Sequence, residues 1–153
     1  MNFPKGKNPA KMKKRKLEAE INYDFSLFGI ISPLKEYKLA WFLNNELDVH
    51  LDKAKDIEIV FLKNQNLIIS NFQYETEHSK IRLLKNKSVD QFADNSAFLL
   101  PELHRFDYLI IVEGFDGTYS NKTLKEKLSS IPQVQFVQSF PIDSLKSKEN
   151  LIF

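Results

Sequence analysis

Two carboxylates, Glu102 and Asp107, are the residues whose types and spacing in this sequence are most suggestive of chemistry. Pro101 fixes its own φ angle and favours a short helical turn, after which Asp107 opens the apolar run 109–112. Two acids held at the mouth of a strand could act as general acid and base or bind a hard cation. The alternative is structural, because acids in turns and at helix starts often accept hydrogen bonds from backbone N–H groups.

The stretch around these acids is also the candidate binding site. The residues that we expect to contact a partner are Pro101, Glu102, Arg105, Asp107 and Tyr108. No other catalytic set is evident: the chain has no cysteine and no GxSxG sequence, and its three histidines fall in different predicted loops. Its four glycines are too few for a loop-built nucleotide site. We therefore expect no metal and no cofactor, and favour binding over catalysis.

The strand that follows the turn is predicted to be central in its sheet. Tyr108, Ile110 and Val112 share one face of this strand, and Leu109 and Ile111 share the other. Apolar residues on both faces indicate a strand that is covered on both sides. The two acids would therefore be held at the end of a buried strand.

The N-terminal half predicts a strand, a helix and a meander. Residues 21–31 are expected to form a strand, with Ser32 as the N-cap and Pro33 as the first residue of a helix that runs to about Leu47. Trp41, in the middle of this helix, is expected in the core. Three further strands complete an antiparallel meander, at residues 57–62, 67–75 and 80–85.

The C-terminal half predicts a strand–helix–strand unit. Gly114 and Gly117 follow the central strand, but their spacing is not that of a phosphate-binding loop, so we expect a polar turn. Ser120 or Asn121 is expected to cap a helix over residues 122–130. The last strand contains Val134, Phe136 and Val137.

Two features of the C-terminal half bear on function. Residues 108–140 have the rhythm of one half of a ferredoxin-like fold and are similar to ACT-type regulatory domains, although the glycine-rich ligand turn of those domains is missing. The apolar end, residues 151–153, either folds back onto the body of the protein or docks on a partner's sheet.

The turn and the following strand resemble the signature of a known family. Pro101-Glu102, three residues and then Phe106-Asp107-Tyr108 are similar to the motif of the IPExxxVDY family of small Bacteroidota proteins. Leu100 stands in place of its isoleucine and Phe106 in place of its valine. Further similarity lies in residues 32–44, 131–134 and 145–153. The resemblance implies no activity, because the family is named for its motif alone.

The basic residues are concentrated at the N-terminus. Residues 1–16 contain seven basic residues and no acid, which leaves fifteen basic and twenty acidic residues in the remainder. We expect residues 1–18 to be a disordered basic arm and residues 19–153 to be a single domain. The arm is either a solubilising tail or an electrostatic contact to nucleic acid. Its candidate contacts are Lys11, Lys13, Lys14, Arg15 and Lys16.

No membrane segment or secretory signal is expected. The arm leads into no apolar run of the kind that follows the basic residues of a signal peptide, and no apolar run approaches the length that spans a bilayer. The absence of cysteine is compatible with a reducing compartment. We expect a cytoplasmic protein.

Together these features predict an α+β domain with a mixed or mainly antiparallel sheet and two or three helices mostly on one face. The leading functional hypothesis is a binding or adaptor protein without catalysis, which recognises a protein partner, or a second copy of itself, through residues 101–108. Two alternatives stay open. One is a small-molecule sensing module built on residues 108–140, and the other is non-specific nucleic-acid contact through the arm.

Overall fold

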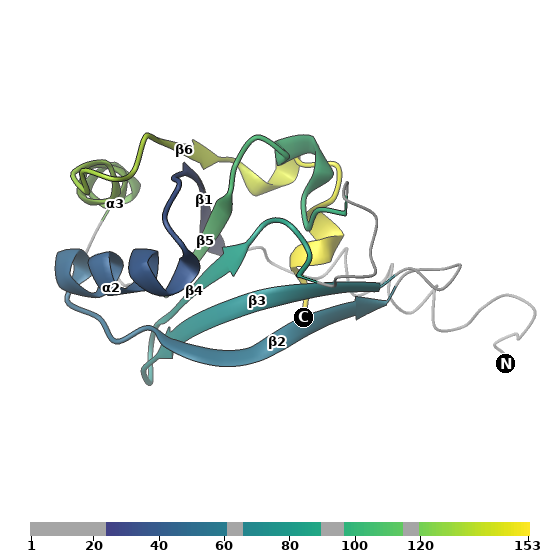
Figure 1. Cartoon of the computed structure of the whole chain (residues 1–153), viewed down its shortest axis with the longest axis horizontal. Helices are drawn as coiled ribbons and strands as arrows, with labels where there is room; N and C mark the ends of the chain where they lie inside the picture. Colours follow the sequence, from purple (N-terminus) through teal and green to yellow (C-terminus); the bar gives the residue numbers. More distant parts are fainter. Residues whose placement is uncertain (1–23, 61–65, 90–96, 115–119) are drawn as a thin grey trace, which may run out of the picture.

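The computed structural model describes residues 24–60, 66–89, 97–114 and 120–153 of the 153-residue chain. These residues form a six-stranded sheet with strand order β2-β3-β4-β5-β1-β6, in which all neighbouring strands are antiparallel (Figure 1). With two α-helices among the described residues, the α+β class is confirmed. The strands are β1 (Phe25–Ile31), β2 (Asp52–Val60), β3 (Asn66–Glu75), β4 (Lys80–Lys85), β5 (Tyr108–Glu113) and β6 (Phe136–Phe140), and the helices are α2 (Glu36–Leu47) and α3 (Asn121–Ser129).

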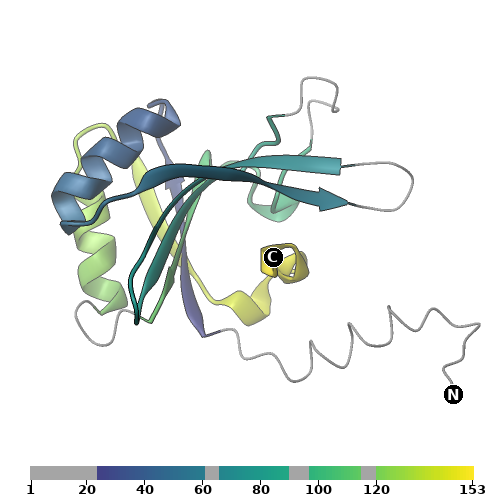
Figure 2. The same cartoon turned by 90° about the horizontal axis from the view of Figure 1, so that it is seen from below.

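Buried side chains lie on both faces of the sheet. The buried residues of α2 and α3 pack with one set of strand side chains, which includes Tyr108, Ile110 and Val112 of β5. Leu109 and Ile111 point to the other face. That face is covered by residues from three 3₁₀ helices, Pro101–Leu103, Ile142–Ser144 and Lys148–Leu151 (Figure 2). The prediction that β5 is covered on both sides is therefore confirmed.

Helix α2 begins later than the sequence predicts. Its N-cap is Lys35 and its first residue is Glu36, so the expected cap at Ser32 is wrong. The Ser32 hydroxyl instead donates to the backbone oxygen of Gln133 at 2.9 Å and accepts from the backbone N–H of Leu34 at 3.2 Å. The Ser32 side chain, which local sequence predicts to cap the helix, thus binds a backbone oxygen 101 residues away.

The expected burial of Trp41 is also wrong. Its side chain is 61% exposed, and Tyr37, one turn earlier, is 57% exposed. The buried stripe of α2 consists of Leu39, Ala40, Leu43 and Leu47. The helix presents its aliphatic residues to the sheet, and the two large aromatic side chains lie on its outer side.

The strand–helix–strand unit at the C-terminus is confirmed, but its last strand begins at Phe136, so the expected place of Val134 in that strand is wrong. The Ser120 hydroxyl accepts a hydrogen bond from the backbone N–H of Thr123 at 3.1 Å and caps α3. Strands β5 and β6 belong to the same sheet, but β1 lies between them and is antiparallel to both. Neither helix in the described parts of the chain is long and apolar enough to cross a bilayer.

Candidate functional site

The predicted turn at Pro101 is a 3₁₀ helix, Pro101–Leu103, that is fixed from beneath by a buried asparagine. The Asn86 side-chain amide donates to the backbone oxygens of Leu103 and Phe106, at 2.9 and 3.1 Å. Its side-chain oxygen accepts from the backbone N–H of Leu100 at 3.0 Å. Asn86 is fully buried, so these three hydrogen bonds satisfy backbone groups that water cannot reach.

Glu102 holds the C-terminal segment. Its carboxylate accepts a hydrogen bond of 2.7 Å from the backbone N–H of Ser147. Partial burial acts to raise the pKa of Glu102, but the hydrogen bonds with Ser147 and its neighbours outweigh this effect and bring the pKa below its usual value. The carboxylate therefore favours its charged form in the folded protein.

Asp107 holds a different segment. Its carboxylate accepts from the backbone N–H of Ser32 at 2.9 Å, and its own backbone N–H donates to Ile30 at 2.9 Å. These bonds tie the end of β1 to the start of β5. Because Glu102 and Asp107 each bind the backbone of a different segment, their geometry is that of the structural alternative rather than of a shared catalytic pair.

The remaining residues of the predicted site divide between core and surface. Tyr108 is buried, and its hydroxyl donates to the backbone oxygen of Leu34 at 2.5 Å. Burial, followed by the nearby charges of Glu36 and Asp107, raises its pKa to about 12. Pro101 and Arg105 are exposed.

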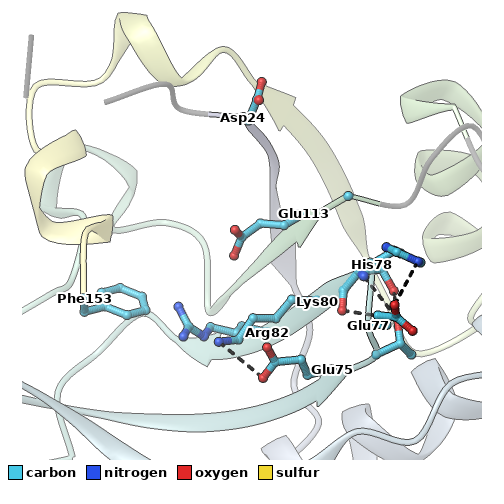
Figure 3. A pocket seen from close by; sticks show the side chains of 11 residues that line it. Asp24, Glu75, Glu77, His78, Lys80, Arg82, Glu113 and Phe153 are labelled. Carbon is cyan, nitrogen blue, oxygen red and sulfur yellow. Dashed lines mark hydrogen bonds and ion pairs between the residues drawn. The ribbon is translucent and has the colours of Figure 1, made fainter. Parts of the chain in front are cut away.

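A groove lies elsewhere, at the end of the sheet where β3, β4 and β5 meet the C-terminal segment (Figure 3). It encloses about 540 Å³ and opens to solvent. Four parts of the chain line it: Asp24 before β1, residues 75–80 with Arg82 from β3, β4 and their connecting turn, Glu113 and Gly114 at the end of β5, and Phe153.

Arg82 lies at the centre of this groove. It is on β4, on the same face as Leu84, opposite Ile111 of β5. Its side chain is half-buried, and its guanidinium carbon lies 4.7 Å from the centre of the Phe153 ring. Burial lowers the pKa of Arg82 from its usual value, an effect opposed by the charges of Glu113 and Glu75.

The guanidinium of Arg82 has no hydrogen bond or ion pair with any residue that the structure describes, and its Nε atom is buried. The buried Nε–H is a donor without an acceptor in the described parts of the chain, and such a group costs about 1–3 kcal/mol. The carboxylate of Glu75 pairs instead with Lys80, at 3.7 Å (Figure 3). Arg82 is therefore available to an acceptor that enters from outside.

The backbone around the groove is tightly arranged. Gly114 has a φ angle of 72°, and a Cβ atom at this position would lie 2.2 Å from the backbone oxygen of His78. Only glycine allows this approach between the end of β5 and the turn that follows β3. Gly114 directly follows β5, whereas the rest of the polar turn predicted here, with Gly117, lies outside the described residues.

The C-terminal segment that forms one wall of the groove folds back onto the body, as one of the two sequence alternatives expects. Leu151 is buried, and the Asn150 side chain donates to the backbone oxygen of Leu99 at 2.8 Å. With the bond from Ser147 to Glu102, these contacts connect the Pro101 turn to the segment that ends at Phe153. The predicted site and the groove are therefore linked through this segment.

Sequence reasoning missed the groove residues Lys80, Arg82 and Glu113, and considered Phe153 only as part of the apolar end. One signal was present: in the strand at 80–85, Arg82 alternates with the buried Ile81 and Leu83 and shares a face with the buried Leu84. A basic side chain that shares a strand face with a buried leucine indicates a charged group that points towards the protein interior.

No metal centre is found in the described ranges, where no group of three or more histidine, aspartate or glutamate side chains could hold an ion. The candidate arm residues Lys11, Lys13, Lys14, Arg15 and Lys16 lie outside those ranges. No model of a known protein family matches the chain, and no curated protein matches it. Membership of the family that the Pro101 turn resembles stays a prediction.

Proposed function

We propose that the protein is a binding module without catalysis that takes a small charged molecule in the groove around Arg82. The observation that carries this proposal is the half-buried guanidinium, which has no acceptor among the described residues and lies in an open groove of about 540 Å³. Arginine side chains in such positions commonly bind carboxylate or phosphate groups.

The strand order supports a sensing role. Strands β4-β5-β1-β6, with helices after β1 and β5, follow the order of a ferredoxin-like βαββαβ unit, to which the hairpin β2–β3 is added at the edge. The resemblance of residues 108–140 to regulatory domains points the same way. Since one fold hosts many functions, this support is analogy, and the groove carries the argument.

The test is an NMR screen of small metabolites against the ¹⁵N-labelled full chain. The pools would contain amino acids, amines, carboxylic acids, sugars and nucleotides. A ligand of the groove should shift the backbone resonances of residues 75–82, 113–114 and 150–153. These shifts should vanish in Arg82→Gln and persist in Arg105→Gln, a matched control because Arg105 is exposed on the turn. Absence of binding in every pool, or equal binding by Arg82→Gln, would refute the proposal.

Recognition of a protein partner through residues 101–108 is the second candidate. Pro101, His104 and Arg105 are exposed on a turn whose backbone is fixed by Asn86, so they form a rigid polar surface. A pull-down from the native host should lose the partner with Arg105→Glu and keep it with Arg82→Gln. Retention of every captured protein by Arg105→Glu would exclude this surface.

A further inference from the structure

The charges in the groove limit what can bind there. Its lining contains four acidic and two basic residues: Asp24, Glu75, Glu77 and Glu113 against Lys80 and Arg82. A polyphosphate would meet a surplus of negative charge, so nucleotides are poor candidates. A ligand with only positive charge would lie beside the unpaired guanidinium of Arg82.

Arg82 is arranged to bind a carboxylate. The guanidinium carbon of Arg82 lies over the Phe153 ring, 4.7 Å from its centre, a contact that leaves the N–H groups without an acceptor among the described residues. The N–H groups point outwards in the guanidinium plane, and they match the two oxygens of a carboxylate. The contact with the ring and the binding of a carboxylate by the N–H groups are therefore compatible.

Glu113 is arranged to bind an ammonium group. The Glu113 carboxylate makes no hydrogen bond or ion pair with the described residues, because its cross-strand partner Lys80 pairs with Glu75 instead. It lies two residues beyond Ile111, the cross-strand partner of Arg82. Such diagonal neighbours are roughly 7–8 Å apart in a sheet, so one small molecule can contact both side chains.

We infer that the ligand is a small zwitterion, such as a free α-amino acid, whose carboxylate binds Arg82 and whose ammonium group binds Glu113. This inference rests on the proposed function and adds the chemical class of the ligand. Such a molecule supplies the acceptor that Arg82 lacks and the donor that Glu113 lacks. It adds no net charge to a groove that already contains charges of both signs.

The test compares matched ligands by isothermal titration with the full chain. The probes are the twenty L-amino acids and, for the tightest of them, the amine without the carboxylate and the acid without the amino group. Inorganic phosphate is the fourth probe. We expect the zwitterion to bind at least about tenfold more tightly than either single-charge analogue, which is about 1.4 kcal/mol, because each analogue lacks one charge-assisted hydrogen bond.

Two variants test which side chain binds each charged group of the ligand. Arg82→Gln should reduce the preference for the zwitterion over the amine, and Glu113→Gln should reduce its preference over the acid. Tighter binding of the amine, the acid or phosphate, or of a sugar or nucleotide, would overturn the zwitterion inference and leave the groove as a binding site. No heat or resonance shift with any class of molecule would overturn both the inference and the proposed function.

Discussion

Replacing Asn86 with alanine should be among the most damaging changes in the chain. The side chain is fully buried and makes three hydrogen bonds to backbone groups on both sides of the Pro101 turn, at 2.9, 3.0 and 3.1 Å. Alanine would leave the N–H of Leu100 and the oxygens of Leu103 and Phe106 without these partners. The cavity left by the amide is lined by the same polar groups.

The expected loss follows mainly from the Leu100 N–H and the Phe106 oxygen, because the Leu103 oxygen still accepts from the Phe106 backbone N–H at 2.9 Å. A buried polar group left unpaired costs about 1–3 kcal/mol, but neighbouring losses are not additive and a water could enter the cavity, so we expect about 3–5 kcal/mol in total. At about 2–4 °C per kcal/mol for a chain of this size, the melting temperature should fall by about 6–20 °C.

Urea unfolding followed by far-ultraviolet circular dichroism would measure this loss. This signal is preferable to tryptophan fluorescence, because the single tryptophan, Trp41, is already 61% exposed in the folded protein. Asn45→Ala is the matched control. Its amide makes one hydrogen bond, to the Trp41 backbone oxygen, at an exposed position, so we expect a change within about 0.5 kcal/mol.

The Asn86→Asp variant sharpens the test. One oxygen of the new carboxylate can still accept from Leu100, but the oxygen that replaces the amide nitrogen would face the backbone oxygens of Leu103 and Phe106. Its protonated form can donate once, so the variant should recover stability relative to the wild type as the pH falls. A loss below about 1 kcal/mol in Asn86→Ala would refute the role given to this residue.

Three further predictions concern packing and titration. A Cβ atom on Gly29 would lie 2.7 Å from the Phe106 ring. The Gly29→Ala substitution should therefore lower the free energy of unfolding by about 1–3 kcal/mol, as measured by urea titration. An unchanged free energy of unfolding would contradict this packing. The pKa of Glu102 is lowered, so the contribution of its carboxylate to stability is present above pH 4.5 and is lost as the pH falls. The amide resonance of Ser147 should therefore move in this acid range in the wild type and stay fixed in Glu102→Gln. Equal movement in both proteins would count against the contact between Glu102 and Ser147. The pKa of Tyr108 is raised from 10.0 to about 12, so its contribution to stability is present below pH 10 and is lost as the pH rises through 12. Ultraviolet titration should show a late-ionising tyrosine in the wild type that is absent in Tyr108→Phe. Identical titration curves for the two proteins would contradict the burial of Tyr108.

The sequence predicted the elements whose signals are local. Residues 108–112 are apolar on both faces, and they lie in a central strand with both faces covered. Ser120 precedes an amphipathic segment, and its hydroxyl caps α3. Each of these features depends on residues within a few positions of one another, which propensity and periodicity can read.

The errors in α2 have non-local or ambiguous causes. Ser32 is a good N-cap by type, but its hydroxyl binds Gln133 in the segment before β6. The sequence of α2 offers two apolar stripes, one through Tyr37 and Trp41 and one through Leu39 and Leu43. The sheet takes the aliphatic stripe, and periodicity alone could not choose between the two.

The candidate site was predicted in part. The Pro101 turn exists, and its acids bind backbone groups, as the structural alternative expects. The groove was not predicted, because Arg82, Glu113 and Phe153 come from separate parts of the chain and meet only through the order of the strands and the return of the C-terminal segment. The alternation around Arg82 could have flagged the arginine but not its neighbours.

The most direct test of the central claim observes the Arg82 guanidinium itself. The chain has three arginines, so the Nε–Hε signal of Arg82 can be assigned in a ¹⁵N spectrum by its loss in Arg82→Lys. Titration with the best-binding member of the metabolite screen should shift this signal and leave that of Arg105 unchanged. A ligand that binds the protein without moving the Arg82 signal would show that the groove around Arg82 is not the binding site.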